Sequence, residues 1–321
     1  MLLSATTSLK DKVTGEKLTQ KYLTPKGPTQ KDSTPKELTQ KELTQKSLAS
    51  KLAAFAVDSL LEEVRLTPKP GLVDSHNNGS HHDLTLRLME SSALSLEETF
   101  FEMAMASFEK RPTRHLRERL AAIGRHGEQQ MLAATGQVNT HKGAIWVLGL
   151  LTGAAAIHLT PTSRVAASIP DLLTTAGAIA SFEDRYKPPT ATNGDQVRRS
   201  FHIRSAREEA AAGFPSLQQT ALPAWTTFAN EPEPIRRLNV LLALMSVVDD
   251  TCILHRSNMK VLKQVRQQAA AIISKGGMGI GSNAGSYRKL DRFVTDQWVS
   301  PGGSADLLAA TIFLNKIIKI N

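Results

Sequence analysis

Two adjacent carboxylates, Asp249 and Asp250, follow directly after the strongly apolar segment 240–248. If this segment is helical, both carboxylates lie within a buried stretch, because the apolar pattern continues beyond them. Buried charges are costly unless they are paired or bind a metal ion. Oxygen ligands suit Mg²⁺, particularly an ion that also contacts phosphate groups. The pattern therefore indicates a metal or substrate-hydroxyl role for one aspartate, and an Asp249–Arg256 ion pair is the structural alternative.

A second polar group lies in the turn-rich segment 67–83. Pro68 and Pro70 fix the backbone on both sides of Lys69, so that a cation is held on a stiff loop, as a phosphate would require. Histidine, asparagine and aspartate side chains follow, and they donate and accept hydrogen bonds of several kinds. A rigid surface loop without a ligand is the alternative.

Two further segments, 139–143 and 300–306, place polar residues and glycines at the expected starts of helices. Free backbone N–H groups at a helix start favour anions, and glycines such as Gly302 and Gly303 let a ligand approach the backbone closely. Asp306, near the first turn of the second helix, is a candidate cap, metal ligand or general base. Ordinary helix capping is the alternative for both segments.

The elements that must position these residues are helices. Apolar residues recur at helical spacing along much of the chain from residue 52 onward, and strictly alternating β-branched runs are missing. The sequence therefore predicts an all-α fold, with one multi-helix catalytic domain at residues 52–321. The polar stretch 184–200, with two prolines and an Asn-Gly pair, predicts a long exposed loop inside this domain.

The first 51 residues have a different composition. Lysine recurs every five residues from Lys21 to Lys51, and this period matches neither a helix nor a strand. Such a segment has no continuous apolar face whose burial would offset the entropy of ordering. We expect residues 1–51 to form a disordered low-complexity tail that takes no part in the chemistry.

Charge and cysteine content restrict the partners and the compartment. The 321-residue chain carries a formal net charge of +9, but roughly +5 of it falls in the lysine-rich tail. The rest is only mildly basic, and we predict neither a nucleic acid nor a membrane as a partner. The single cysteine, Cys252, excludes an intramolecular disulfide and favours a cytoplasmic protein. The apolar runs 143–159 and 240–248 are expected to be buried core helices.

Taken in order, these segments resemble the triphosphoribosyl-dephospho-coenzyme A synthase family. The matching blocks are Pro68–Asp74, Asn77–His81 with Asp83, Asn139–Ala144, Gly213–Ser216, Val248–Thr251, Leu254–Arg256 and Ser300–Leu308. They extend over nearly all of residues 52–314. The blocks at 139–144 and 213–216 look closest to the malonate decarboxylase branch of the family, and the citrate lyase branch is its near neighbour.

The resemblance implies a glycosyl transfer. The 2′-hydroxyl of 3′-dephospho-coenzyme A would attack the anomeric carbon of ATP, and adenine would leave. The product would be the prosthetic-group precursor for the acyl carrier subunit of malonate decarboxylase, loaded by a separate carrier-protein transferase. Such chemistry needs a general base, carboxylates near an oxocarbenium-like ribose, Mg²⁺ and cations for the triphosphate, and a hydrogen-bond donor for adenine.

These chemical needs lead to a hypothesis about the residue roles. Catalysis would fall to Asp249 or Asp250 as the base, and to His141 or His81 as the donor toward adenine. The implied Mg²⁺ ligands are Asp249, Asp250 and Asp306. The implied substrate-binding and phosphate-binding residues are Lys69, Asn77, Asn78, Asn139, Lys142, Gly143, His255, Arg256, Gly302 and Gly303. Two alternatives remain: a helical Mg²⁺-dependent hydrolase of nucleotides or ADP-ribose-like substrates, and a non-catalytic helical binding protein.

Overall fold

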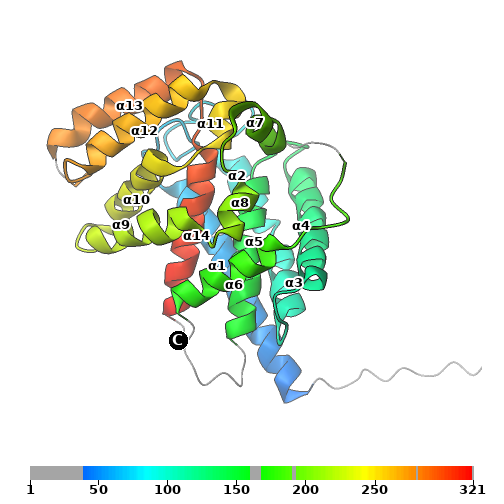
Figure 1. Ribbon diagram of the computed structural model, residues 1–321. Helices are drawn as coiled ribbons and strands as arrows, with labels where there is room; N and C mark the ends of the chain where they lie inside the picture. The colour runs from blue at the N-terminus through cyan, green and yellow to red at the C-terminus, as the bar shows by residue number, and fades with distance from the viewer. Residues whose placement is uncertain (1–38, 160–167, 190–192, 280, 320–321) are drawn as a thin grey trace, which may run out of the picture. The chain divides into compact units, whose positions relative to one another are not determined.

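The computed structural model describes residues 39–159, 168–189, 193–279 and 281–319, and within them it contains helices and no β-strand (Figure 1). The predicted all-α fold is confirmed. The α-helices are α1 Gln40–Arg65, α2 Leu86–Leu94, α3 Glu97–Ser107, α4 Arg114–Ala134, α5 Lys142–His158, α6 Ile169–Ser181, α7 Asn193–Phe201, α8 Ala206–Ala211, α9 Leu222–Thr227, α10 Glu233–Val247, α11 Thr251–Arg256, α12 Met259–Ile273, α13 Ala284–Asp296 and α14 Gly302–Ile318. A π-helix, η1, spans Leu217–Ala221, and a short 3₁₀ helix, η2, spans Gly281–Asn283.

Helices α5 and α14 lie in the interior of the unit formed by residues 39–321. They pack against each other, α1 packs against both, and α3 packs against α1 and α5. Both helices are apolar on nearly all sides: Leu148 and Leu151 of α5 and Leu308 and Phe313 of α14 are fully buried. A helix of this kind must be enclosed by other helices. The expected core helix at 143–159 is thus confirmed, and no helix among the described residues is long and apolar enough to cross a membrane.

Helix α1 begins at Gln40, inside the segment predicted to be disordered. Its start carries a capping box, in which Thr39 and Glu42 exchange side-chain and backbone hydrogen bonds. Ala49 is fully buried and Leu48 packs against the core. The lysine repeat obscured this helix because its five-residue period spreads Lys41, Lys46 and Lys51 around α1, and all three are exposed. The predicted boundary is wrong for residues 40–51, and residues 1–38 lie outside the described part of the chain.

The secondary structure differs from the sequence prediction in two segments. The helix expected to continue from the apolar run 240–248 through Asp249 and Asp250 is divided, since α10 ends at Val247 and α11 begins at Thr251. The side chain of Asp250 causes the restart by accepting hydrogen bonds from the first backbone N–H groups of α11. The polar stretch 184–200 is not all loop, because α7 begins at Asn193 and buries Val197.

Candidate active site

The starts of α5, α11 and α14 meet, and the glycines there permit the close approach. A Cβ atom on Gly143 would lie 2.0 Å from Oδ2 of Asp306. A Cβ on Gly303 would lie 3.3 Å from Oδ2 of Asp250. We call this region the three-helix junction. It comprises Glu63, Lys69, Ser92, Thr140, His141, Gly143, Asp250, Cys252, Gly302, Gly303, Ser304 and Asp306.

Both carboxylate oxygens of Asp250 accept hydrogen bonds within the junction. Its residue is 1% exposed. Oδ1 accepts a hydrogen bond from the Cys252 amide at 3.0 Å, and Oδ2 accepts from the Ser304 amide at 2.9 Å and from its hydroxyl at 3.1 Å. Burial raises the pKa of Asp250, and the Ser304 donors oppose that shift. Asp250 therefore caps the starts of both α11 and α14 and holds them together.

Asp249 is paired with a residue outside the junction. Its Oδ1 accepts a hydrogen bond from Arg266 of α12 at 2.7 Å. The ion pair between Asp249 and Arg256 is not formed, because the break between α10 and α11 removes the continuous helix on which that pairing depended. Arg256 instead donates to the Ser80 carbonyl at 2.7 Å and lies 3.1 Å from Nδ1 of His81.

The three aspartates expected to bind Mg²⁺ are therefore not gathered in one place. Among the described residues, no group of three or more His, Cys, Asp or Glu side chains is arranged to hold a metal ion. Asp249 is paired with an arginine, and both oxygens of Asp250 already accept hydrogen bonds. Asp306 alone has a carboxylate without such partners.

Asp306 is half-buried and makes no hydrogen bond to the described residues. Burial raises the pKa of its carboxyl group well above the ordinary value, and the nearby carboxylates of Glu63 and Asp250 raise it further. The group faces Gly143, which is exposed to solvent. A half-buried carboxyl group with a raised pKa beside an exposed glycine is suited to exchange a proton with a substrate hydroxyl.

Lys69 reaches the junction, but its charge is already neutralised. Its ammonium group donates to the Glu63 carbonyl at 2.7 Å and to the Glu63 carboxylate at 2.6 Å. The two side chains are 1% and 6% exposed. The loop that carries Lys69 is rigid, as predicted, because Asp74 accepts hydrogen bonds from the backbone amides of Lys69, His76 and Asn77.

His141 precedes α5 and is 3% exposed. Its Nδ1 lies 2.7 Å from the Ser92 hydroxyl, which lies 2.5 Å from the Thr140 hydroxyl. Burial, together with the positive charge of Lys69, lowers the pKa of His141 to about 4, so the imidazole is neutral at pH 7. Its Nε2 is buried and has no hydrogen-bond partner in the described part of the chain. A buried polar atom without a partner indicates a ligand or an ordered water.

The remaining predicted residues, with the exception of His81, lie at the surface. His81 stands apart from these exposed residues, since its side chain is 8% exposed and burial and Arg256 lower its pKa to about 4. Lys142 pairs with Glu128 of α4. The exposed residues are Asn77, Asn78, Asn139, Lys142 and His255.

Sequence reasoning did not single out Glu63, Ser92 or Ser304. Glu63 had a usable signal, because it lies seven residues after Ala56 on the buried face of its helix. Ser92 had no signal, since only the tertiary fold brings α2 to His141. Ser304 lay within a recognised block, but its bond to Asp250 depends on the packing of α14 against α11.

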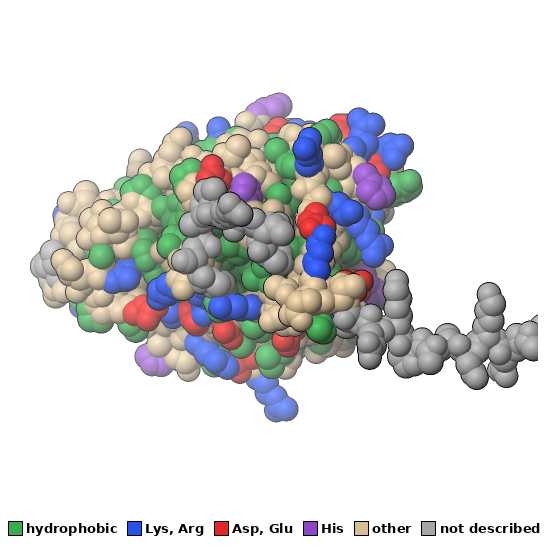
Figure 2. Space-filling model, turned by 90° about the horizontal axis from the view of Figure 1, so that it is seen from below, with side chains coloured by type: hydrophobic (Ala, Val, Ile, Leu, Met, Phe, Trp, Pro, Cys, Tyr) green, Lys and Arg blue, Asp and Glu red, His purple; other side chains and the backbone are tan. Residues whose placement is uncertain are grey.

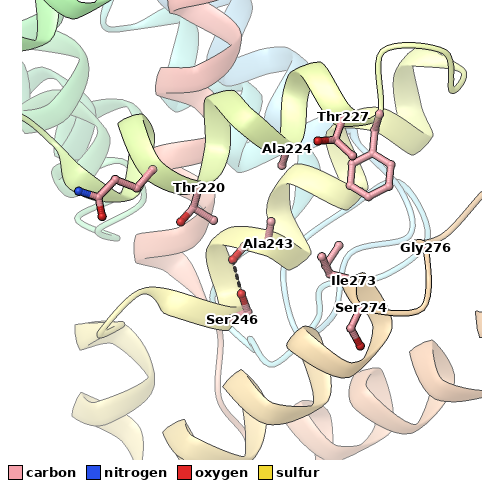
Figure 3. A pocket seen from close by; sticks show the side chains of 10 residues that line it. Thr220, Ala224, Thr227, Ala243, Ser246, Ile273, Ser274 and Gly276 are labelled. Carbon is pink, nitrogen blue, oxygen red and sulfur yellow. Dashed lines mark hydrogen bonds between the residues drawn. The ribbon is translucent and has the colours of Figure 1, made fainter.

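A separate hollow of about 420 Å³ lies where η1 and α9 face α10 and α12 (Figure 3). Small side chains line it, among them Thr220, Ser246 and Ser274, and the Ser246 hydroxyl donates to the Ala243 carbonyl at 2.6 Å. None of the predicted site residues lines this hollow. On the face drawn in Figure 2, Lys and Arg side chains alternate with Asp, Glu and apolar side chains instead of forming one continuous basic surface.

Comparison with known proteins supports the resemblance. The chain matches the family described as ATP:dephospho-CoA triphosphoribosyl transferase over residues 49–321. It is 44% identical over 270 residues to a probable 2-(5''-triphosphoribosyl)-3'-dephosphocoenzyme-A synthase of Pseudomonas fluorescens, covering 83% of this chain and 91% of the relative. It is 41% identical over 268 residues to the synthase of that name from Klebsiella pneumoniae, covering 83% and 94%. No solved structure matches the chain. The chain thus belongs to the ATP:dephospho-CoA triphosphoribosyl transferase family and is a transferase.

Proposed function

We propose that this family member transfers the 5-triphosphoribosyl group of ATP to the 2′-hydroxyl of 3′-dephospho-coenzyme A at the three-helix junction. The bond between the ribose anomeric carbon and adenine N9 breaks, and a bond from that carbon to the acceptor oxygen forms. The hydroxyl proton passes to a base, and adenine takes up a proton as it leaves. The observation that carries the proposal is the half-buried, unbonded carboxyl group of Asp306 beside the helix starts.

We assign the base role to Asp306 in preference to Asp249 or Asp250. A base must approach the proton that it removes, and its pKa must be high enough to hold that proton. Asp306 meets both needs, because it faces an exposed glycine and has a raised pKa. Asp250 has a raised pKa as well, but its oxygens are occupied by the amides that it caps. It acts as a positioning residue.

We propose that a phosphate group of the substrate binds at the N-terminus of α5. Its backbone N–H groups receive no side-chain cap, whereas the start of α14 is capped by Asp250. The helix is 17 residues long, so its dipole favours an anion at this end. Gly143 in the first turn is exposed, so solvent reaches this end of the helix.

The donor set does not fit a Mg²⁺ ion held by three protein carboxylates, for the reasons given above. We propose that Mg²⁺ enters as part of the ATP substrate, bound mainly by its phosphates and water, as is usual for this ion. The side chains of the junction then bind and orient the ATP complex without forming a metal cage.

His141 is the proposed donor toward the departing adenine. Its imidazole is neutral, and its Nε2 atom has no partner among the described residues. If the Ser92 hydroxyl donates to Nδ1, Nε2 carries the proton and can donate it in a hydrogen bond to a ring nitrogen of adenine. A donor preorganised for the charge that develops on a leaving group accelerates its departure.

We further propose that the product serves malonate decarboxylase through a separate carrier-protein transferase, in the cytoplasm where ATP and coenzyme A precursors are available. The blocks at 139–144 and 213–216, which look closest to that branch, support this choice. Complementation of strains that lack the synthase of either pathway checks it. Restored malonate decarboxylase activity is expected, and restoration of citrate lyase alone would contradict it.

The reaction itself is tested by measuring adenine release from MgATP with and without 3′-dephospho-coenzyme A, followed by mass spectrometry of the acceptor. We expect adenine only when the acceptor is present, together with a triphosphoribosyl adduct. Adenine formed equally without acceptor would instead establish the hydrolase.

A further inference from the structure

Arg117 of α4 is a buried cation without a hydrogen-bond or ion-pair partner among the described residues. It is 7% exposed, and its guanidinium group makes no hydrogen bond or ion pair with any residue that the structure describes. Its Nε atom is fully enclosed. The guanidinium carbon lies 4.6 Å from the centre of the Trp146 ring. Cation–π contact offsets only part of the cost of burying a charge.

The carboxylates whose charge acts on Arg117 are already bound by other arginines. Asp184 accepts a hydrogen bond from Arg125 at 2.6 Å. Glu118 accepts two from Arg185, at 2.7 and 3.0 Å. Of these three arginines, Arg117 alone makes no hydrogen bond or ion pair to a carboxylate of the described residues.

An uncompensated buried charge destabilises a fold, and an arginine stays protonated in proteins. Desolvation lowers the pKa of Arg117, which reflects this cost. A bound anion would remove this cost, since the described residues provide no hydrogen-bonding carboxylate for Arg117. The planar guanidinium group fits phosphate oxygens best, because it can donate two parallel hydrogen bonds.

The position of this cation relates it to the three-helix junction. Trp146 follows Gly143 by three residues on α5, so the two lie on one face of the helix about one turn apart. Gly143 contacts Asp306, the proposed base. The Trp146 indole is fixed by donating to the Ala206 carbonyl of α8 at 3.4 Å. A nucleotide at the junction can therefore extend one phosphate toward Arg117.

We propose that Arg117, held against Trp146, binds a phosphate group of a nucleotide substrate of this enzyme. The proposal rests on the reaction proposed above and adds a binding residue to it. The phosphate comes either from the triphosphate of ATP or from the diphosphate of 3′-dephospho-coenzyme A. Both present the same chemistry to the guanidinium group, and the experiment separates them.

The test compares Arg117→Met and Arg117→Lys with Arg119→Met, a control that removes an exposed arginine from the same helix. Thermal unfolding is measured without ligand and with inorganic tripolyphosphate, MgATP or 3′-dephospho-coenzyme A. Because Arg117 makes no hydrogen bond or ion pair with the described residues, we expect Arg117→Met to unfold at the wild-type temperature or above it. We expect it to lose the stabilisation by tripolyphosphate and by one of the two nucleotides.

Binding constants give the magnitude and the source of the phosphate. Loss of a charged hydrogen-bond partner should weaken the affinity for one nucleotide by roughly 10- to 100-fold. Arg117→Lys should recover part of that loss, and Arg119→Met should bind like the wild type. A folded Arg117→Met variant that binds all three ligands normally would overturn the proposal. The binding measurements do not depend on adenine release. A failure of the proposed reaction would therefore appear in the adenine assay and not in the binding constants.

Discussion

The loop of residues 67–83 and the three-helix junction contain similar polar residues, but their hydrogen bonds are arranged differently. In the loop, Asp74 accepts hydrogen bonds from Thr67 and from backbone amides nearby, so its bonding capacity is filled. At the junction, Asp306 makes no hydrogen bond to described residues and Nε2 of His141 has no partner there. Polar groups that are satisfied internally build geometry, whereas groups left unsatisfied mark where a substrate is expected.

The largest effect is expected from a substitution that displaces the Asp306 carboxylate without removing it. Gly143→Ala places a Cβ 2.0 Å from Oδ2 of Asp306, and the carboxylate, at the end of a side chain, must move. We expect adenine release to fall about 100-fold, the scale of a 1 Å misplacement, with the fold retained. Circular dichroism checks that the fold is retained, and the adenine assay measures the rate of release. Gly285→Ala, which meets no atom within 4 Å, is the control. Unchanged release in Gly143→Ala would show that the contact has no catalytic meaning.

A second test replaces His141, whose Nε2 atom has no hydrogen-bond partner among the described residues. His141→Gln should slow adenine release by roughly 10- to 100-fold, as expected for the loss of one preorganised donor. The defect should shrink with ATP analogues whose base leaves more easily, because they need the donor less. A defect of equal size for every leaving group would assign His141 a structural role.

The satisfied carboxylate of the junction should act on stability first. Asp250→Ala removes the cap of two helices and leaves buried amides unpaired, so the free energy of unfolding should fall by about 2–3 kcal/mol. Denaturant titration measures the change. Asp250→Asn keeps an acceptor oxygen and should recover part of the loss. Wild-type stability in Asp250→Ala would contradict the capping account.

The smallest effect is expected at the neighbouring aspartate, which the sequence favoured equally. Asp249→Asn weakens a half-exposed ion pair with Arg266, and such pairs contribute at most about 1 kcal/mol. Adenine release should stay within about threefold of the wild type at saturating MgATP. A loss comparable to that of the junction variants would restore Asp249 as a base or metal ligand.

These differences show what the sequence could and could not predict. Helical periodicity was sufficient for the all-α fold and for the buried helices α5 and α14. It failed at residues 40–51, where the five-residue lysine repeat does not follow the helical period although the segment is helical. The recognised blocks did bring together Gly143, Asp250 and Asp306.

Their roles could not be predicted, because they depend on which hydrogen bonds the tertiary fold completes. The break after α10 sends Asp249 to Arg266 and Asp250 to Ser304, although the two are adjacent in the sequence. The pairing of Lys69 with Glu63 likewise joins a loop to a helix, and only the packed fold shows it.

The central claim, that Asp306 is the general base, is tested most directly by the pH dependence of adenine release in the wild type and in Asp306→Asn. A base works only when deprotonated, so wild-type release should fall as the pH drops through the raised pKa of Asp306. Asp306→Asn should stay folded, lose activity by about 100-fold or more, and lack that acid limb. A folded Asp306→Asn variant with near-normal turnover, or with an unchanged acid limb, would contradict the account.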